Sequence, residues 1–165
     1  MKLLLGHGAS GTAASMTPWV QALTSHGVQA QGIDLPRGSA EHALSTFRSR
    51  LEEHPGAAIG GHSFGGRVAS LLAAEQPVAA LVLLSYPLHR PGHPEALRVD
   101  HWPAINSPVL LLSGESDPFA TLDLLTQSVR LLPNARLVSY PGRRHGLLTV
   151  VDDAAARIAA FLVAQ

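Results

Sequence analysis

Cysteine is absent from this chain of 165 residues, so it can form no disulfide, thiolate metal site or cysteine nucleophile. Charged residues are also sparse, at 15% of the chain, and the 12 basic and 12 acidic side chains give a formal net charge of zero. With neither sign in excess, the composition gives no support to a nucleic-acid partner or to binding at an anionic membrane surface.

Long apolar runs are absent as well. The run that follows Lys2 ends at Gly6-His7-Gly8, which is too early for the hydrophobic region of a signal peptide. No other run reaches the length of a membrane span, and we therefore expect a cytoplasmic protein. Apolar residues still make up 46% of the chain, which is enough for a core, and the length suits one domain over residues 1–165.

Six short apolar runs recur along the chain, and each is unbroken rather than alternating. Such runs are typical of strands buried on both faces of a parallel sheet. The expected strands are residues 3–6, 28–33, 57–60, 79–84, 109–113 and 136–140. The stretches with helical character between and after them are residues 17–26, 40–54, 64–76, 119–132 and 152–163. Thr17 and Ser39 stand at or before the starts of the first two.

This alternation of strand and helix predicts an α/β fold, a three-layer αβα sandwich with about six mainly parallel strands. One insertion, residues 85–108, breaks the pattern because it is rich in proline, which removes backbone donors and fixes φ. We expect it to be irregular, too small for a separate cap domain, and placed as a short lid or rim over a site. A connecting loop that only packs on the sheet is the alternative.

The segment Gly61-His62-Ser63-Phe64-Gly65 matches the Gly-x-Ser-x-Gly pattern of a nucleophile elbow. In that turn the serine lies between a strand and a helix, and the two glycines relieve crowding of a strained backbone. With 15 glycines in the chain the bare pattern is weak, but the expected strand before it and helix after it supply the required setting. A turn that merely joins strand to helix is the alternative, and a phosphate loop is disfavoured because no Gly-Lys-Ser/Thr ending follows.

A nucleophilic serine needs a base, and the base needs an orienting carboxylate. In the expected fold these follow in the order serine, acid, histidine. Asp117 and His145 occur in that order, each soon after an expected strand, so the sequence predicts that they meet Ser63 at the carboxyl edge of the sheet. Asp117 could instead cap the next helix, Glu115 is a rival orienting carboxylate, and His145 could be an exposed loop residue.

The oxyanion of a tetrahedral intermediate needs two backbone donors. We expect one at the amide of Phe64 and the other at Ala9, with Ser10 as the second choice, in the glycine-rich loop after the first strand. His7, at the start of that loop, is expected to brace it rather than act as the base. The expected substrate-binding side chains are Ser10, His62, Tyr86 and Leu88, with Trp102 as a further candidate.

No cofactor is expected, because serine-mediated acyl transfer needs none. A metal site is disfavoured, since no carboxylate or thiolate pattern accompanies the histidines of the insertion. Those histidines are His89, His93 and His101.

These motifs resemble the α/β-hydrolase superfamily over essentially the whole chain. The residues that carry this resemblance are His7-Gly8, Ser63 with its flanking glycines, Asp117 and His145. A narrower resemblance, to the KANL/Tex-type, dienelactone-hydrolase-like α/β-hydrolases, rests on residues 60–70, 83–89 and 117–119. It implies a compact hydrolase core without a cap domain. This chain has Phe64, His62 and Ser10 where that family often has methionine, a basic residue and glycine.

The sequence therefore predicts a serine hydrolase of carboxylesterase or thioesterase type, with a small-molecule ester as its partner and an acyl-enzyme as its intermediate. A non-catalytic protein-interaction module on a hydrolase scaffold is the alternative, which the resemblance implies for some eukaryotic relatives. A complete triad favours the enzyme, because a scaffold has no need to keep all three residues.

Overall fold

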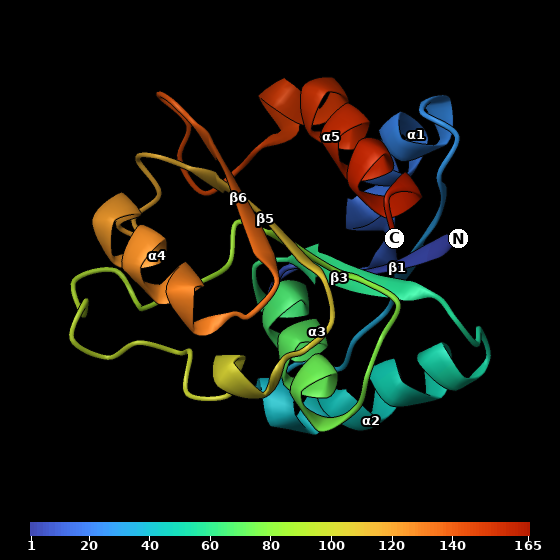
Figure 1. Cartoon of the computed structure of the whole chain (residues 1–165), viewed down its shortest axis with the longest axis horizontal. Coiled ribbons are helices and arrows are strands. Elements are labelled where there is room, and N and C mark those ends of the chain that lie inside the picture. Colours follow the sequence, from blue (N-terminus) through green and yellow to red (C-terminus); the bar gives the residue numbers. More distant parts are fainter.

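A six-stranded sheet lies at the centre of the computed structural model, which describes all residues, Met1–Gln165 (Figure 1). Its strands are β1 (Lys2–Gly6), β2 (Gln29–Ile33), β3 (Ala58–His62), β4 (Leu81–Leu84), β5 (Val109–Gly114) and β6 (Ala135–Tyr140). They lie in the order β2-β1-β3-β4-β5-β6, and every neighbouring pair is parallel. Each predicted strand is therefore confirmed.

Burial explains the unbroken apolar sequences of the inner strands, whereas β2 departs from the expected pattern because Gln29 and Gln31 alternate with its less exposed residues. The inner strands β3, β4 and β5 are buried along almost their whole length, whereas the edge strands β2 and β6 are partly exposed. A strand covered on both faces has no solvent side on which polar residues would alternate.

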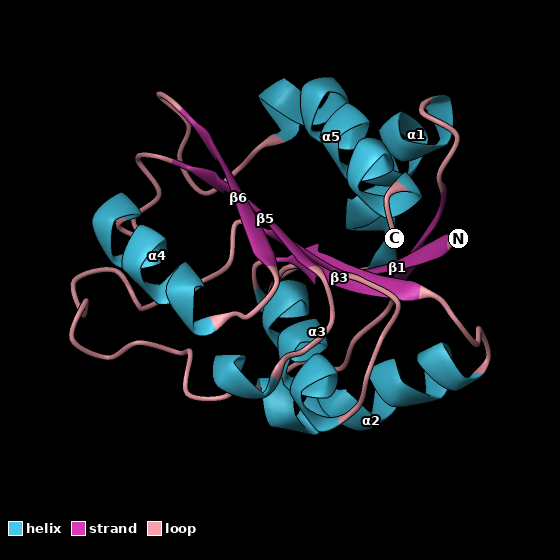
Figure 2. Ribbon diagram, in the orientation of Figure 1, coloured by secondary structure: helices cyan, strands magenta, loops and turns pink.

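Five α-helices cover the two faces of the sheet. They are α1 (Thr17–Ser25), α2 (Ala40–Glu52), α3 (Phe64–Glu75), α4 (Leu122–Ser128) and α5 (Val151–Val163). Figure 2 shows α1 and α5 on one face and α2, α3 and α4 on the other, which is the predicted three-layer sandwich. Each face buries its own apolar core, of 25 residues under α2 to α4 and of 19 under α1 and α5. No helix has both the length and the apolar character needed to cross a membrane.

Two expected helix starts differ from the structure. Thr17 is the first residue of α1 rather than its cap, because the 3₁₀ turn Ala13–Met16 leads directly into the helix. The helix expected from Phe119 begins only at Leu122, because Asp117 draws the chain into a turn and accepts a hydrogen bond from the Phe119 amide. Ser39 does cap α2, accepting from the His42 amide at 3.1 Å.

Residues 85–108 form the irregular connection between β4 and β5. Their only regular element is the short 3₁₀ helix Trp102–Ala104, and they build no cap domain. Part of this connection, including Tyr86, Leu88 and Trp102, is buried in the core under α2 to α4. The connection thus packs on the body of the fold and leaves other side chains free to form the rim of a cavity.

Candidate active site

Ser63 lies on the turn between β3 and α3, and its backbone is strained. Its φ of 50° and ψ of −111° fall outside the conformations that most L-residues adopt. The turn also packs against β1 so closely that a Cβ on Gly65 would lie 2.2 Å from the Gly6 carbonyl carbon. A Cβ on Gly61 would lie 2.5 Å from the Gly6 oxygen, so both glycines of the motif are required by the close approach of two backbones.

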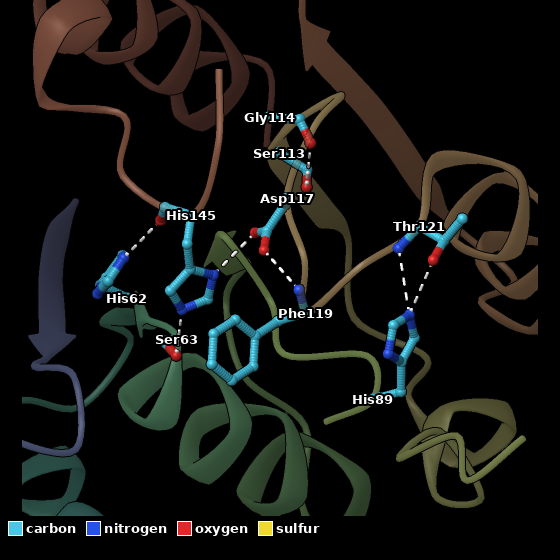
Figure 3. Close-up of polar contacts among 9 residues, drawn as sticks. All are labelled: His62, Ser63, His89, Ser113, Gly114, Asp117, Phe119, Thr121 and His145. Atoms are coloured by element: carbon cyan, nitrogen blue, oxygen red, sulfur yellow. Dashed lines mark hydrogen bonds and ion pairs between the residues drawn. The ribbon is translucent and has the colours of Figure 1, made fainter. Parts of the chain in front are cut away.

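The structure brings the three residues predicted at the sheet edge together in one chain of hydrogen bonds. The His145 Nε2 atom lies 2.8 Å from Ser63 Oγ, and its Nδ1 atom lies 2.8 Å from Asp117 Oδ2 (Figure 3). Because a carboxylate only accepts, Nδ1 carries the proton and Nε2 is left to accept from the serine hydroxyl. We call this arrangement the hydrogen-bonded triad.

The carboxylate of Asp117 combines the two roles that are alternatives in the sequence analysis, cap and orienting carboxylate. Its Oδ1 accepts from the Phe119 amide at 2.8 Å, as a turn cap does, while Oδ2 holds the imidazole of His145. The side chain is fully buried, so both oxygens are fixed in direction. Glu115, the rival carboxylate, instead accepts from the Ser139 hydroxyl at 2.8 Å and does not orient His145.

His62 and Phe119 hold the loop of His145 from two further sides. The Nε2–H of His62 donates to the His145 carbonyl at 3.1 Å, since that oxygen can only accept. Burial is the largest cause of a lowered His62 pKa, which keeps this ring neutral beside His145. The ring of Phe119 lies against His145 with centroids 4.3 Å apart. Sequence reasoning gave Phe119 no role, although its place two residues after Asp117 in a turn was a signal.

The loop after β1 is braced by His7, as predicted. The Leu35 amide donates to His7 Nε2 at 3.0 Å, so Nδ1 carries the proton and donates to the Gly8 carbonyl at 2.7 Å. The Gly11 amide donates to the same carbonyl at 2.9 Å and closes a tight turn. The amide of Ala9 within this turn and that of Phe64 have no acceptor within the chain, and both residues line the cavity beside Ser63. They are the available donors for an oxyanion.

A cavity of about 560 Å³ opens beside the triad, a size that suits a small-molecule ligand. Six of the predicted residues line it, namely Ala9, Ser10, His62, Ser63, Phe64 and His145. The lining also includes Phe119 and three arginines to which the sequence analysis gave no role in the site, namely Arg67, Arg90 and Arg98. This cavity is therefore more cationic than the predicted substrate-binding residues implied.

The prediction that Tyr86 and Leu88 bind substrate is wrong. Their exposed fractions are 1% and 0%, and neither lines the cavity. The hydroxyl of Tyr86 donates to the Arg98 carbonyl at 2.6 Å, and its ring packs against that of Trp102, which is also buried. An aromatic or apolar residue after a strand looks the same in sequence whether it faces a core or a cavity.

The three histidines of the insertion have separate partners. His89 contacts Thr121, His93 contacts Glu95, and His101 contacts Ser70. No group of three side chains suited to metal coordination occurs in the structure.

A strained elbow serine at the carboxyl edge of a parallel sheet, with its histidine and aspartate in that chain order, defines the α/β-hydrolase class of proteins. Residues 37–157 match the family model described as the alpha/beta hydrolase domain. The chain therefore belongs to the alpha/beta hydrolase domain family. The matched range contains Ser63, Asp117 and His145.

Solved structures with the same fold cover nearly all of this chain. The monoacylglycerol lipase of Paleococcus ferrophilus is 17% identical with a TM-score of 0.83, over 98% of this chain and 93% of that one. Est1E from Butyrivibrio proteoclasticus, solved with ferulic acid, is 18% identical with a TM-score of 0.81, over 100% and 90%. The pyrethroid hydrolase of Sphingobium faniae JZ-2 is 18% identical with a TM-score of 0.76, over 99% and 98%. At this identity the likeness shows the fold alone.

The match to a curated relative covers a short segment. The non-heme chloroperoxidase of Burkholderia pyrrocinia is 43% identical over 51 residues, which are 30% of this chain and 18% of that protein. A segment of this length carries no statement about the activity of either whole protein.

Proposed function

We propose that this chain is a serine hydrolase of carboxylesterase or thioesterase type that cleaves small esters through an acyl-enzyme. The observation that carries the proposal is the hydrogen-bonded triad, with 2.8 Å between Ser63 Oγ and His145 Nε2 and 2.8 Å between His145 Nδ1 and Asp117 Oδ2. The serine of this triad lines a cavity large enough for a substrate.

In the first half of the reaction, Ser63 Oγ attacks the ester carbonyl while its proton moves to His145 Nε2. The buried carboxylate of Asp117 stabilises the imidazolium that forms. The amides of Ala9 and Phe64 donate to the oxyanion of the tetrahedral intermediate. When the intermediate collapses, the alcohol or thiol leaves with the proton of His145, and the acyl group stays on Ser63.

In the second half, a water molecule gives its proton to His145 Nε2 and attacks the acyl carbon. The second tetrahedral intermediate releases the carboxylic acid and returns the proton to Ser63 Oγ. The neutral ring of His62 keeps the His145 loop in place during both halves without adding a second positive charge.

The names of two structural neighbours, a monoacylglycerol lipase and a pyrethroid hydrolase, agree with hydrolysis as the reaction class. We also propose that residues 1–165 act as one domain and that the chain belongs to the narrower KANL/Tex-type group. The resemblance of residues 60–70 and 117–119 to that group supports this placement.

The test is hydrolysis of p-nitrophenyl butyrate by Ser63→Ala and by a control, Ser45→Ala, which removes an exposed hydroxyl on α2. Loss of the nucleophile is expected to lower kcat by at least about 10⁴-fold, whereas the control keeps its rate. Both variants should keep the melting temperature of the parent. Parent-like hydrolysis by Ser63→Ala, or a folded parent with no activity on any ester tried, would overturn the proposal.

A further inference from the structure

Three arginines gather on one side of the cavity that contains Ser63. Arg67 comes from the first turn of α3, directly after the elbow, and Arg90 and Arg98 come from residues 85–108. The same three side chains line a second hollow of about 430 Å³. We call Arg67, Arg90 and Arg98 the arginine cluster.

The arginine cluster has little negative charge to balance it. Arg67 reaches only Glu41, at 3.4 Å, and that carboxylate is largely exposed. The Nε atom of Arg67 is buried without a hydrogen-bond partner. Neither Arg90 nor Arg98 takes part in an ion pair. Burial is the largest cause of a lowered Arg98 pKa, and the positive charges of Arg67 and Arg90 lower it further.

Hydrogen bonds, two of them from the buried side chains of Tyr86 and His89, fix the backbone that carries two of these arginines. The Tyr86 hydroxyl donates to the Arg98 carbonyl at 2.6 Å, and the Arg98 amide donates to the Leu88 carbonyl at 2.8 Å. The Thr121 amide donates to His89 Nε2, so the Nδ1–H of His89 donates to the Arg90 carbonyl at 2.9 Å. Figure 3 shows His89 joined to Thr121, on the segment that also carries Phe119. The segment that carries Arg90 and Arg98 is thus anchored to the loop that carries Asp117 and Phe119.

We propose that the arginine cluster binds an oxyanion of the substrate, so that the ester or thioester cleaved at Ser63 carries a carboxylate or a phosphate. Guanidinium groups bind both anions through charge-assisted, often bidentate hydrogen bonds. A bound anion also relieves the repulsion among three like charges at the edge of a low-dielectric cavity. This inference rests on the proposed function, because Ser63 must be the nucleophile for the arginine cluster to act on substrate choice.

Two matched substrate pairs test the proposal and separate the two anions. The first compares mono-p-nitrophenyl adipate with p-nitrophenyl hexanoate, which differ by one carboxylate on the acyl side. The second compares S-acetyl-4′-phosphopantetheine with S-acetylpantetheine, which differ by one phosphate on the leaving-group side. We expect the anionic member of at least one pair to have the higher kcat/KM by about tenfold or more.

The variants are Arg90→Gln and Arg98→Gln, with Arg130→Gln as a matched control on an exposed residue outside both cavities. Each of the first two should lower kcat/KM for the preferred anionic substrate about tenfold and leave its neutral partner within about twofold. Arg98→Lys should recover part of the loss, because it restores the charge without the planar fork. The control should change neither substrate.

A binding measurement keeps the result independent of turnover. Calorimetry on Ser63→Ala should show the preferred anion, adipate or 4′-phosphopantetheine, binding about tenfold more weakly once Arg98→Gln is added. Two results would overturn the anion proposal and leave the hydrolase intact. One is Ser63-dependent hydrolysis with no preference within either pair, and the other is a preference that Arg90→Gln and Arg98→Gln leave unchanged. Ester hydrolysis that does not depend on Ser63 overturns the proposed function instead. Absence of any arginine-dependent anion binding to Ser63→Ala overturns the arginine cluster as a binding site.

Discussion

The two sides of the cavity are built in different ways. Ser63 follows β3 and His145 follows β6, and the parallel pairings from β3 through β6 bring the carboxyl ends of these strands to one edge. Arg90 and Arg98 belong to a segment whose only regular element is a short 3₁₀ helix, and it is held by core packing and by hydrogen bonds that include those from Tyr86 and His89. The triad is thus positioned by the order of the strands, whereas Arg90 and Arg98 are positioned by contacts of particular side chains in an irregular segment. Substitutions should affect the two sides differently.

The largest effect is expected on the topological side, at Asp117. Asp117→Asn should lower kcat about 10⁴-fold, because an amide no longer imposes the tautomer in which His145 Nε2 accepts from Ser63. Glu115→Gln is the matched control, since Glu115 contacts Ser139 rather than His145. Steady-state kinetics on a neutral ester measure both. A greater loss in Glu115→Gln would move the orienting role to Glu115.

A smaller effect is expected at His62, which acts as a positioning residue for the loop of His145. His62→Phe keeps a ring but removes the donor to the His145 carbonyl, and kcat should fall about 10- to 100-fold with little change in KM. Ester kinetics over a range of pH would separate this role from substrate binding. A rise in KM at unchanged kcat would return His62 to the set of substrate-binding residues.

A still smaller effect is expected from Tyr86→Phe, because Tyr86 supports Arg98 on the other side of the cavity. The Arg98 carbonyl would lose its buried donor, and the free energy of unfolding should fall by about 1 kcal/mol. The preference for an anionic ester should weaken about threefold because Arg98 is less well placed, while the rate on a neutral ester is unchanged. Urea unfolding and paired kinetics provide both numbers. A drop in the neutral rate of similar size would mean that the two sides are not independent.

The last prediction concerns acid stability rather than activity, and it rests on His101. Burial and the positive charge of Arg67 lower the pKa of His101 to about 4, and its neutral Nε2 lies 2.8 Å from Ser70 Oγ. The unfolded chain therefore protonates His101 more readily than the folded chain does. The stability that the neutral ring contributes is complete above pH 6.5 and declines as the pH falls toward 4. In urea unfolding, His101→Gln should lose less stability than the parent between these pH values. Parallel losses would contradict the assignment.

The same contrast explains what could be predicted from the sequence. Short, largely apolar runs predicted the six strands. Ser63, Asp117 and His145 could be predicted from their places soon after strands, because parallel strand ends converge without regard to side-chain detail. The irregular segment offered no such rule, and so Tyr86 was placed in the cavity although its ring is in the core. Arg90 and Arg98 could not be assigned to the site from sequence, because the backbone that carries them is held by hydrogen bonds from Tyr86 and His89 that no local pattern reveals. Phe119 was missed for a similar reason, since its contact with His145 arises only when two loops meet.

The most direct test of the central claim is covalent labelling with a fluorophosphonate, followed by peptide mass spectrometry to locate the adduct. An activated serine attacks phosphorus, expels fluoride and retains the phosphonyl group, whereas an ordinary serine hydroxyl does not. The account predicts one adduct per chain, located on Ser63 and absent from Ser63→Ala. A folded parent protein that stays unlabelled, or an adduct on another residue, would contradict it.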